Sequence, residues 1–465
     1  MIRDTRIGLL PLYLELYDEV RPEARPEMEA FAERVATVLG EVGLDVVSAP
    51  VLTTRLQIET EVHDLLNDEQ LDGLATVHLA YSPSLEAIDA LVRADRPLLL
   101  LDTTPAPSFG ADADAEMMFR NHGIHGVQDL SCTLQRRERP YLLSVGHIDD
   151  GAFRDDVALN ARGMRAARAL STMRVLVIGE AFEGMGDFAV EPELLGADLG
   201  VHMHRISVEE LAQVARQITD EELDEEAACD SGQCDCSTVG PEVIRRTNRV
   251  GLAVRKMMAE EDAGAMTFNF ASFTGASGID TVPFLEASKA MASGKGYAGE
   301  NDALTAALVG ALAQAGCRLT FTEMFCPDWE GGTVFMSHMG ECGLGVTAEG
   351  GTLVEKHYAF SDVGNPAVAI PKIIPGEATL VNLAPGAQGS FKFITSRVEV
   401  LDRGPVAGFP DVPHFWLRPM DCDLREFLQR YSEIGGTHHL ALCLGDEREL
   451  VRRMAKVLDR EFYEV

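Results

Sequence analysis

The feature that most restricts the fold of this chain is an alternation of short apolar stretches with helix-like stretches. Residues 97–101 form the clearest apolar stretch, a proline followed by four consecutive leucines. A helix-like segment at 84–93 and another apolar stretch at 71–80 precede it. Continuous apolar strands separated by helices are typical of parallel sheets that helices cover on both faces. The N-terminal part is therefore predicted to be a Rossmann-like α/β domain.

A second alternation of the same kind begins near residue 173, and a different pattern begins at Cys317. The strand-like segments of the second part are 174–179, 199–206 and 265–269. After Cys317 strand-like segments dominate, at 319–325, 332–339, 346–354, 378–383 and 390–400. Such a series predicts an antiparallel, β-barrel-like sheet. We therefore expect an α/β protein with two Rossmann-like parallel-sheet domains, at 1–170 and 171–316, and a mostly antiparallel β-barrel-like domain at 317–465.

Size and charge narrow the classes of function. A chain of 465 residues is expected to form two or three domains. Its formal net charge of -34 argues against nucleic acid and anionic membranes as partners, because both require a basic surface. No stretch approaches 18 uncharged apolar residues, and the first residues do not form a secretory signal. With nine scattered cysteines, an odd number, the expected location is the cytoplasm.

Two segments suggest cofactor sites but match them poorly. Cys229, Cys234 and Cys236 follow an acidic run, and their C-x4-C-x-C spacing lacks the paired C-x2-C of a structural zinc site. Asp230 or another subunit could supply a fourth ligand, but we expect a mobile polar loop. The glycine-rich segment at 179–186 follows a strand without matching G-x-G-x-x-G, so we do not expect it to bind a nucleotide.

Acidic and imidazole side chains occur in the last third at positions where the local pattern favours apolar residues. In the segment 319–325, Glu323 shares its predicted face with Leu319, Phe321 and Phe325, because alternate residues of a strand point the same way. A lone carboxylate in such a setting would be strongly desolvated unless a cation or metal faced it. A satisfied core histidine and a solvated rim carboxylate are the simpler explanation for each residue taken alone.

The same argument extends to three further residues. His338 lies inside a strand-like run, where it would share a face with Val334 and Met336. Glu300 follows a glycine, and His439 comes after a Gly-Gly pair. Two carboxylates and two imidazoles that converge could hold a divalent cation and leave positions open for a substrate.

Four segments together resemble the L-arabinose isomerase family. GYAGEND at 296–302 and TAAL at 305–308 resemble that family's G-[FY]-A-G-E-G-D and T-A-A-L. FTE at 321–323, SHMGE at 337–341 and GGTHH at 435–439 resemble its F-M-E, S-H-M-L-E and G-G-x-H-H. The family is similar in fold to L-fucose isomerase, with two Rossmann-like domains followed by a β-barrel-like domain.

The resemblance implies a metal-dependent aldose–ketose isomerase that acts on a free sugar by enediolate proton transfer. It implies Mn²⁺, with Co²⁺ or Mg²⁺ as alternatives, and a homotrimer or homohexamer with active sites between subunits. The implied metal ligands are Glu300, Glu323, His338 and His439. The two glutamates would also be the catalytic acid and base.

Two further histidines would bind substrate. The resemblance assigns this role to His438 and to His125, which would reach a neighbouring subunit's site. His122 competes with His125 for the role.

The chain departs from the family pattern at the positions that contact sugar. LPL at 10–12 stands where the family has G-S-Q, and LDTT at 101–104 stands where it has F-H-T-Q. Asn301 replaces a glycine, and Met324 replaces an acidic residue. The sugar is therefore left open between an L-arabinose-like pentose and a related sugar. A non-catalytic sugar-binding or regulatory protein, and an epimerase or lyase on the same scaffold, remain alternatives.

Overall fold

The computed structural model describes residues 3–348 and 350–465. These residues form two compact units. The smaller unit comprises the chain through Arg168 together with Arg452–Arg460, and the larger unit comprises Ala169–Val451 together with Glu461–Val465. Within the described ranges, no helix has both the length and the apolarity needed to cross a bilayer.

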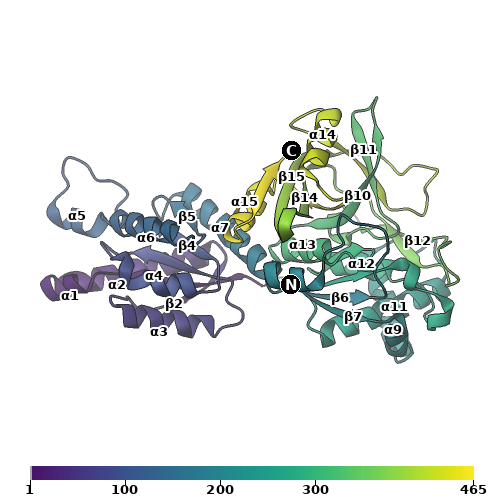
Figure 1. Cartoon of the computed structure of the whole chain (residues 1–465), viewed down its shortest axis with the longest axis horizontal. Coiled ribbons are helices and arrows are strands. Elements are labelled where there is room, and N and C mark those ends of the chain that lie inside the picture. Colours follow the sequence, from purple (N-terminus) through teal and green to yellow (C-terminus); the bar gives the residue numbers. More distant parts are fainter. Residues whose placement is uncertain (1–2, 349) are drawn as a thin grey trace. The chain divides into compact units, whose positions relative to one another are not determined.

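The smaller unit is built on a sheet that helices flank (Figure 1). This parallel sheet has five strands in the order β2-β1-β3-β4-β5. Its strands are β1 (Thr5–Leu12), β2 (Leu44–Ser48), β3 (Gly73–His78), β4 (Leu98–Asp102) and β5 (Leu142–Val145). Its helices are α1 (Glu15–Val20), α2 (Arg25–Glu41), α3 (Arg55–Leu66), α4 (Ser84–Arg93), α5 (Ala115–Asn121), α6 (Ile124–Arg136) and α7 (Gly151–Leu170) except for the last two residues of α7.

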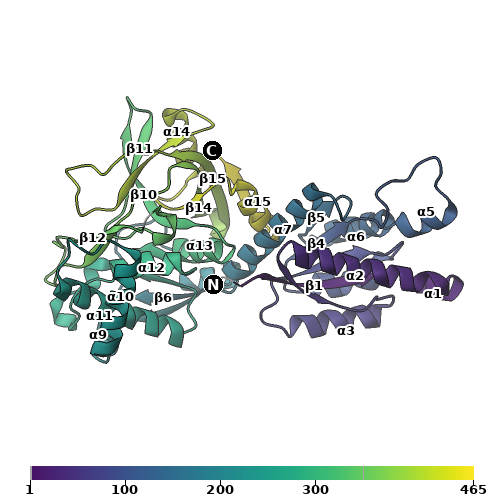
Figure 2. The same ribbon diagram turned by 180° about the vertical axis from the view of Figure 1, so that it is seen from behind.

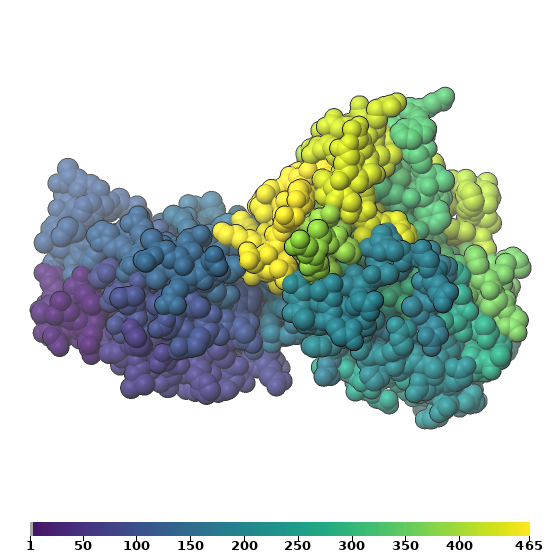
Figure 3. Space-filling model, in the orientation of Figure 1, coloured from purple at the N-terminus to yellow at the C-terminus, as the bar shows by residue number. Residues whose placement is uncertain are grey.

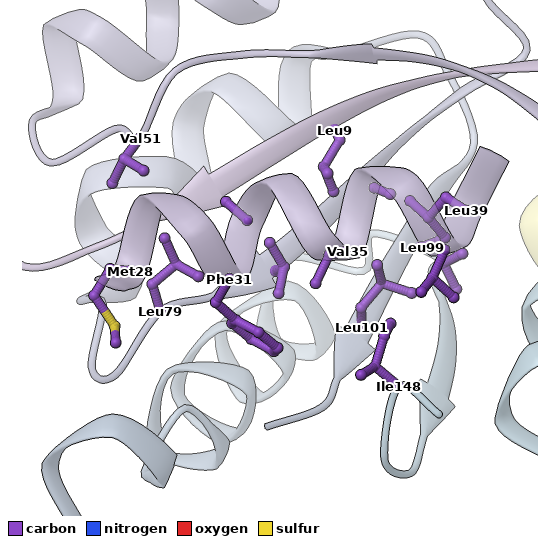
Figure 4. Packing of buried hydrophobic residues seen from close by; sticks show 14 of the residues in the cluster. Leu9, Met28, Phe31, Val35, Leu39, Val51, Leu79, Leu99, Leu101 and Ile148 are labelled. Carbon is purple, nitrogen blue, oxygen red and sulfur yellow. The ribbon is translucent and has the colours of Figure 1, made fainter. Parts of the chain in front are cut away.

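The leucine run of β4 is explained by burial on both faces of this sheet. Leu99 and Leu101 belong to a core cluster with α2, where Phe31 and Val35 face the sheet (Figure 4). Leu98 and Leu100 belong to a second cluster, whose helical residues come from α3, α4 and α6. Successive side chains of a strand point to opposite faces, so a strand covered on both sides needs an apolar residue at every position.

The larger unit contains a four-stranded parallel sheet with strand order β7-β6-β8-β9. Its strands are β6 (Arg174–Ile178), β7 (His202–Ile206), β8 (Ala265–Phe268) and β9 (Gly296–Gly299). The helices of this part are α8 (Pro192–Leu194), α9 (Val208–Ala215), α10 (Asp220–Gln233), α11 (Pro241–Glu260), α12 (Phe284–Ala292) and α13 (Ala303–Gln314).

Six antiparallel strands of the larger unit close into a barrel in the order β14-β17-β10-β11-β16-β15, and β15 returns to β14. They are β10 (Leu319–Asp328), β11 (Thr333–Ser337), β14 (Gly376–Pro385), β15 (Phe391–Val400), β16 (His414–Pro419) and β17 (His439–Leu444). Strand β18 (Glu461–Glu464) pairs in parallel with β15, and β12 (Thr352–Glu355) pairs with β13 (Ala367–Ile370) outside the barrel. Helix α14 (Leu424–Ile434) belongs to this unit, whereas α15 (Arg448–Val457) belongs to the smaller unit from Arg452 onward.

Helix α13 joins the parallel sheet to the barrel. It contacts β6, β8 and β9 on one side and β10, β14 and β17 on the other, and the two views agree on this arrangement (Figures 1 and 2). A helix enclosed in this way is apolar all round, as its sequence ALTAALVGALAQ shows. In the space-filling view, teal residues of the parallel-sheet part and green and yellow residues of the barrel share the surface of this unit (Figure 3).

The fold class agrees with the prediction of two parallel-sheet parts and a barrel. The structure places the second parallel sheet and the barrel in one compact unit. The domain division at 316/317 therefore stays a prediction of the sequence.

Two local predictions were wrong. The segment that carries Cys229 is not a mobile loop but helix α10, and Cys234 is buried in a small apolar cluster. The strand expected at 346–354, in which residue 349 lies outside the described residues, is a strand only from Thr352 onward. Leu344–Val346 instead forms a turn of 3-10 helix.

Candidate active site

Four predicted residues come from four different strands of the larger unit or from the positions directly after them. Glu300 directly follows β9, and Glu323 lies within β10. His338 directly follows β11, and His439 is the first residue of β17. Strand pairing brings the barrel residues together, because Glu323 is in register with His439 on one side and with Ser337 on the other.

The turn that carries Glu300 has an unusual backbone. Glu300 and Asn301 have φ values of 58° and 64°, in the left-handed region that residues with a side chain seldom adopt. Backbone strain of this kind is concentrated at functional sites. Asn301 stabilises the turn by donating from Nδ2 to the carbonyl oxygens of Gly179 at 3.1 Å and Glu180 at 2.6 Å. Gly299 must lack a side chain, because a Cβ there would lie 2.6 Å from Cε1 of His338.

The four side chains converge on one point. Nε2 of His439 lies 3.0 Å from Oε2 of Glu300 and 2.9 Å from Oε1 of Glu323. Nε2 of His338 lies 3.4 Å from Oε1 of Glu323 and 3.9 Å from Oε2 of Glu300. Glu300, His338 and His439 are buried, and Glu323 is nearly so. The structure therefore brings together all four residues that the sequence singled out.

Asp302 orients His439 and was not assigned a role by the sequence argument. Its Oδ2 accepts a hydrogen bond from Nδ1 of His439 at 2.8 Å. Its other oxygen accepts from the backbone N–H of Thr305 at 2.8 Å and so caps α13. Because an ionised carboxylate only accepts hydrogen bonds, this contact leaves Nε2 of His439 free to act as a ligand.

Glu341 orients His338 in the same way and was also missed. Its Oε1 lies 2.6 Å from Nδ1 of His338 and also accepts from the hydroxyl of Tyr297. Its Oε2 accepts from the backbone N–H of Gly340 at 2.6 Å. A sequence signal existed for both carboxylates, since Asp302 and Glu341 lie in the two segments that also carry Glu300 and His338.

Aromatic rings hold the imidazoles. The ring of Phe321 meets His338 and His439 edge-on, at centroid distances of 4.8 Å and 4.9 Å. The ring of Phe188 stacks on His439 at 4.6 Å with an interplanar angle of 8°. These contacts restrict rotation of both ligand-type side chains.

Phe325 and His338 differ from the predicted strand pattern. Phe325 does not share the buried face of Glu323, and its side chain is 49% exposed. A bulge between Met324 and Cys326 shifts the register of β10 at this point, which ends the alternation. His338 also lies beyond the last residue of β11 and turns to Phe321 and Glu323, while Val334 and Met336 pack in the barrel core.

The charges in this cluster are strongly coupled. Burial alone would raise the pKa of Glu323, but the neighbouring imidazoles of His338 and His439 outweigh it and lower the pKa to about 2. The pKa of Glu300 is lowered for the same reasons. Burial alone would lower the pKa of His439, but Asp302 and the two glutamates raise it to about 10. Without a metal the site therefore holds imidazolium–carboxylate pairs.

The residues fit a divalent cation. Nε2 of His338 is buried and has no hydrogen-bond partner among the described residues, although two carboxylates face it. Both imidazoles are held through Nδ1 by a carboxylate, which is the usual support of a metal-binding histidine. Mixed carboxylate and imidazole donors suit a divalent metal cation.

His438 lies at the edge of the same cluster. Ligand atoms of Glu300, Glu323, His438 and His439 all lie within 4.8 Å of one another, so His438 competes with His338 as a fourth ligand. Its Nε2 is 3.7 Å from Oε1 of Glu323, and its side chain is 38% exposed.

His125 is found in the smaller unit. It is exposed on α6, and its ring meets His122 at 5.5 Å. His122 is less exposed and contacts the hydroxyl of Tyr17 at 3.2 Å.

The fold and the site together define a class: α/β proteins in which a barrel and a parallel sheet enclose a carboxylate–imidazole centre. Comparisons with known proteins identify the family within this class. The N-terminal domain of L-arabinose isomerase matches residues 16–174, the central domain matches residues 185–317, and the C-terminal domain matches residues 318–461.

Relatives over most of the chain agree. An L-arabinose isomerase of Nocardioides sp. is 27% identical over 423 residues, which cover 86% of this chain and 82% of the relative. That of Aeromonas hydrophila is 25% identical over 443 residues, covering 90% and 85%. That of Geobacillus thermodenitrificans is 26% identical over 452 residues, covering 91% and 88%. The chain belongs to the L-arabinose isomerase family, a family of intramolecular oxidoreductases that interconvert aldoses and ketoses.

Proposed function

We propose that the protein is a divalent-cation-dependent isomerase that converts a free aldose, an L-arabinose-like pentose or a related sugar, into the corresponding ketose. The observation that carries this proposal is the convergence of two carboxylate oxygens, at 3.0 Å and 2.9 Å, on Nε2 of His439. Beside it lies a buried Nε2 of His338 that has no hydrogen-bond partner within the described part of the chain. Family membership supports the same reaction class.

Glu300, Glu323, His338 and His439 would hold the cation, with Mn²⁺ preferred over Co²⁺ and Mg²⁺. When bound, it would supply Lewis-acid polarisation of the sugar carbonyl and make the neighbouring C–H more acidic. One glutamate removes the proton from C2, and the other delivers a proton to C1. A hydroxyl proton moves from the C2 oxygen to the C1 oxygen, so aldose and ketose have the same composition.

The experiment that tests the activity is an NMR assay of ketose formation from a panel of pentoses and hexoses with Mn²⁺, Co²⁺ or Mg²⁺. We expect a ketose from at least one sugar and no turnover after chelation. A C2 epimer or a cleavage product would indicate an epimerase or a lyase instead. Sugar binding without any conversion would contradict the proposal.

The acid–base role of Glu323 gives a sharper prediction. Glu323→Gln should lower kcat by about 10²–10⁴-fold, because general acid–base catalysis contributes that much. Metal content should be measured on the same sample, so that loss of turnover with the metal still bound isolates the proton-transfer role. Retained turnover in this variant would rule that role out.

We further propose a homotrimer or homohexamer in which His125 reaches a neighbouring subunit's site. The exposure of His125, beside a less exposed His122 that contacts Tyr17, supports His125 as the residue that reaches out. The cytoplasmic location stays a prediction of the sequence.

A further inference from the structure

The glycine-rich segment after β6 ends at the candidate site. Residues 179–191 connect β6 to the three-residue helix α8, so no long helix follows the glycines as it would in a dinucleotide-binding loop. Instead, Asp187 contacts His438, and Phe188 contacts both His438 and His439. The proposed chemistry gives this segment no role.

Asp187 binds His438 through one oxygen and two hydrogen bonds. Oδ2 of Asp187 accepts from the backbone N–H of His438 at 3.0 Å and contacts its Nδ1 at 2.6 Å. The backbone bond fixes where the carboxylate sits, and the second contact fixes the ring. Because a carboxylate accepts hydrogen bonds, the proton of the imidazole belongs on Nδ1.

This contact leaves Nε2 of His438 facing the site. Nε2 lies 3.7 Å from Oε1 of Glu323, too far for a hydrogen bond between them, so Nε2 remains available to a ligand at the site. The side chain of His438 is 38% exposed, whereas those of His338 and His439 are 3% and 0% exposed. Of these three imidazoles, His438 is the one that a bound sugar can reach.

Phe188 anchors the segment next to Asp187. Its ring is buried, stacks on His439 at 4.6 Å, and lies 5.5 Å from the ring of His438. Two consecutive residues of the segment thus hold two consecutive histidines. Because Phe188 stacks on His439, a proposed metal ligand, this contact also fixes the position of the neighbouring Asp187.

We propose that Asp187 is a positioning residue for substrate recognition: it holds His438 as the Nδ1–H tautomer, so that Nε2 accepts a hydrogen bond from a hydroxyl of the bound sugar. The inference rests on the proposed isomerase function for its kinetic consequence. The tautomer of His438 itself does not depend on that function.

The test compares Asp187→Ala with Asp187→Asn. The alanine variant removes both contacts. The asparagine variant keeps an oxygen that can accept from the backbone N–H and from Nδ1, so it should rescue the geometry. The matched control is Glu183→Gln, which changes an exposed acidic residue of the same segment.

The first measurement is the tautomer of His438, read from side-chain ¹⁵N shifts of protein labelled at histidine, with His438→Gln to assign the signal. We expect Nδ1–H in the wild type and in Asp187→Asn, and a mixture or Nε2–H in Asp187→Ala. An Nε2–H tautomer in the wild type, or the same tautomer in Asp187→Ala, would overturn the proposal whether or not the protein is an isomerase.

The second measurement separates KM from kcat on the sugar that gives the most ketose. Asp187→Ala should raise KM by about tenfold, as expected for loss of one substrate hydrogen bond, with kcat changed by less than about threefold. Asp187→Asn and the control should stay within about twofold of the wild-type KM. A fall in kcat with loss of bound Mn²⁺ would overturn the proposal, because it would place Asp187 in support of the metal. No ketose from the wild type would contradict the proposed function alone.

Discussion

At the scale of single residues, the site is organised by pairs in which a carboxylate fixes an imidazole. Asp302 holds His439, and Glu341 holds His338, in each case through Nδ1. Each pair leaves Nε2 directed at the same two glutamates. The raised pKa of His439 means that its imidazole carries an extra proton when no cation is bound. A cation that binds Nε2 would displace this proton, so cation binding should release protons.

His338 and His438 compete for the fourth ligand position, and their substitutions should differ. His338→Gln should lower the bound Mn²⁺ below one per chain or weaken its affinity by at least tenfold, because it removes a buried donor held by Glu341. His438→Gln should keep the metal and raise KM, because this imidazole is the exposed one. Metal titration by calorimetry with chelator-treated protein measures the difference.

The opposite pattern, with metal lost in His438→Gln and retained in His338→Gln, would exchange the two roles. His204→Gln is a suitable control, since His204 is an exposed histidine on β7 of the same unit, far along the chain from these residues.

The sequence correctly predicted which residues share a face where the strand alternates regularly. It failed where the backbone of the strand is irregular. Leu319, Phe321 and Glu323 share one face of β10, as period-two spacing requires. The bulge after Met324 exposes Phe325, and we found no sequence pattern that predicts this bulge. The carboxylates behind the histidines were also missed, because a hydrogen bond to Nδ1 leaves no periodic signal.

At the scale of elements, the contact between β9 and α13 positions Glu300 and Asp302. Gly296 allows this contact, because a Cβ there would lie 2.0 Å from the carbonyl oxygen of Ala306. Gly296→Ala should therefore destabilise the larger unit by about 1–3 kcal/mol or more, the usual cost of overpacking. Urea unfolding followed by circular dichroism measures this change.

The matched control for Gly296→Ala is Gly232→Ala. Gly232 lies within α10 and has open space where its Cβ would be. Alanine there should stabilise the helix by about 0.5–1 kcal/mol, since glycine is the poorer helix former. If both substitutions changed the free energy of unfolding equally, the close approach of β9 to α13 would not contribute to stability.

Helix α10 also shows what the sequence could have revealed. Thr219 and Glu222 form a capping box at its start, a pattern of threonine and glutamate three residues apart that is visible in the sequence. The acidic run and the cysteines after it obscured this signal. Helix α10 forms ion pairs with two other helices: Glu226 on α10 pairs with Arg255 on α11 and with Lys289 on α12.

This ion-pair cluster predicts an acid dependence of stability. Burial alone would raise the pKa of Glu226, but Arg255 and Lys289 outweigh it and lower the pKa to about 2, below the ordinary value of 4.5. A carboxyl with a lowered folded pKa stabilises the fold above its unfolded pKa and loses that contribution as the pH falls toward its folded pKa. Glu226 should therefore contribute up to about 3 kcal/mol at pH 7 that disappears between about pH 5 and pH 2.

Glu226→Gln should remove this contribution at pH 7 and flatten the pH dependence of the unfolding free energy below pH 5. Glu225→Gln, which changes the exposed neighbour on the same helix, should leave both unchanged. An identical pH dependence in wild type and Glu226→Gln would show that the cluster does not stabilise the fold.

At the scale of the whole molecule, the alternation of apolar and helical stretches correctly predicted the two parallel sheets, and the series of strand-like segments after Cys317 correctly predicted the barrel. It could not predict strand order, because order depends on which edges pair across long sequence distances. Strand β16 was missed, and it is the strand that links β11 to β15 in the closed barrel. Strand β18 was missed as well and joins β15 only after the chain has passed through α15.

The division into two compact units leads to a prediction about metal removal. Glu300, Glu323, His338 and His439 all lie in the larger unit. A ligand that binds only the folded form stabilises the unit that holds it, by about 2.7 kcal/mol at a hundredfold excess over its Kd. Adding Mn²⁺ to chelator-treated protein should therefore raise the melting temperature of the larger unit and leave that of the smaller unit unchanged.

Differential scanning calorimetry, with and without Mn²⁺, measures this effect as a shift in one of two transitions. Glu300→Gln provides the control, because loss of a charged ligand should abolish the shift while leaving both transitions in place. Assignment of the transitions follows from Gly296→Ala, which should lower the transition of the larger unit alone. A single transition that moves as a whole with Mn²⁺ would show that the two units unfold together, and an unchanged trace would show that the cation does not bind the folded site.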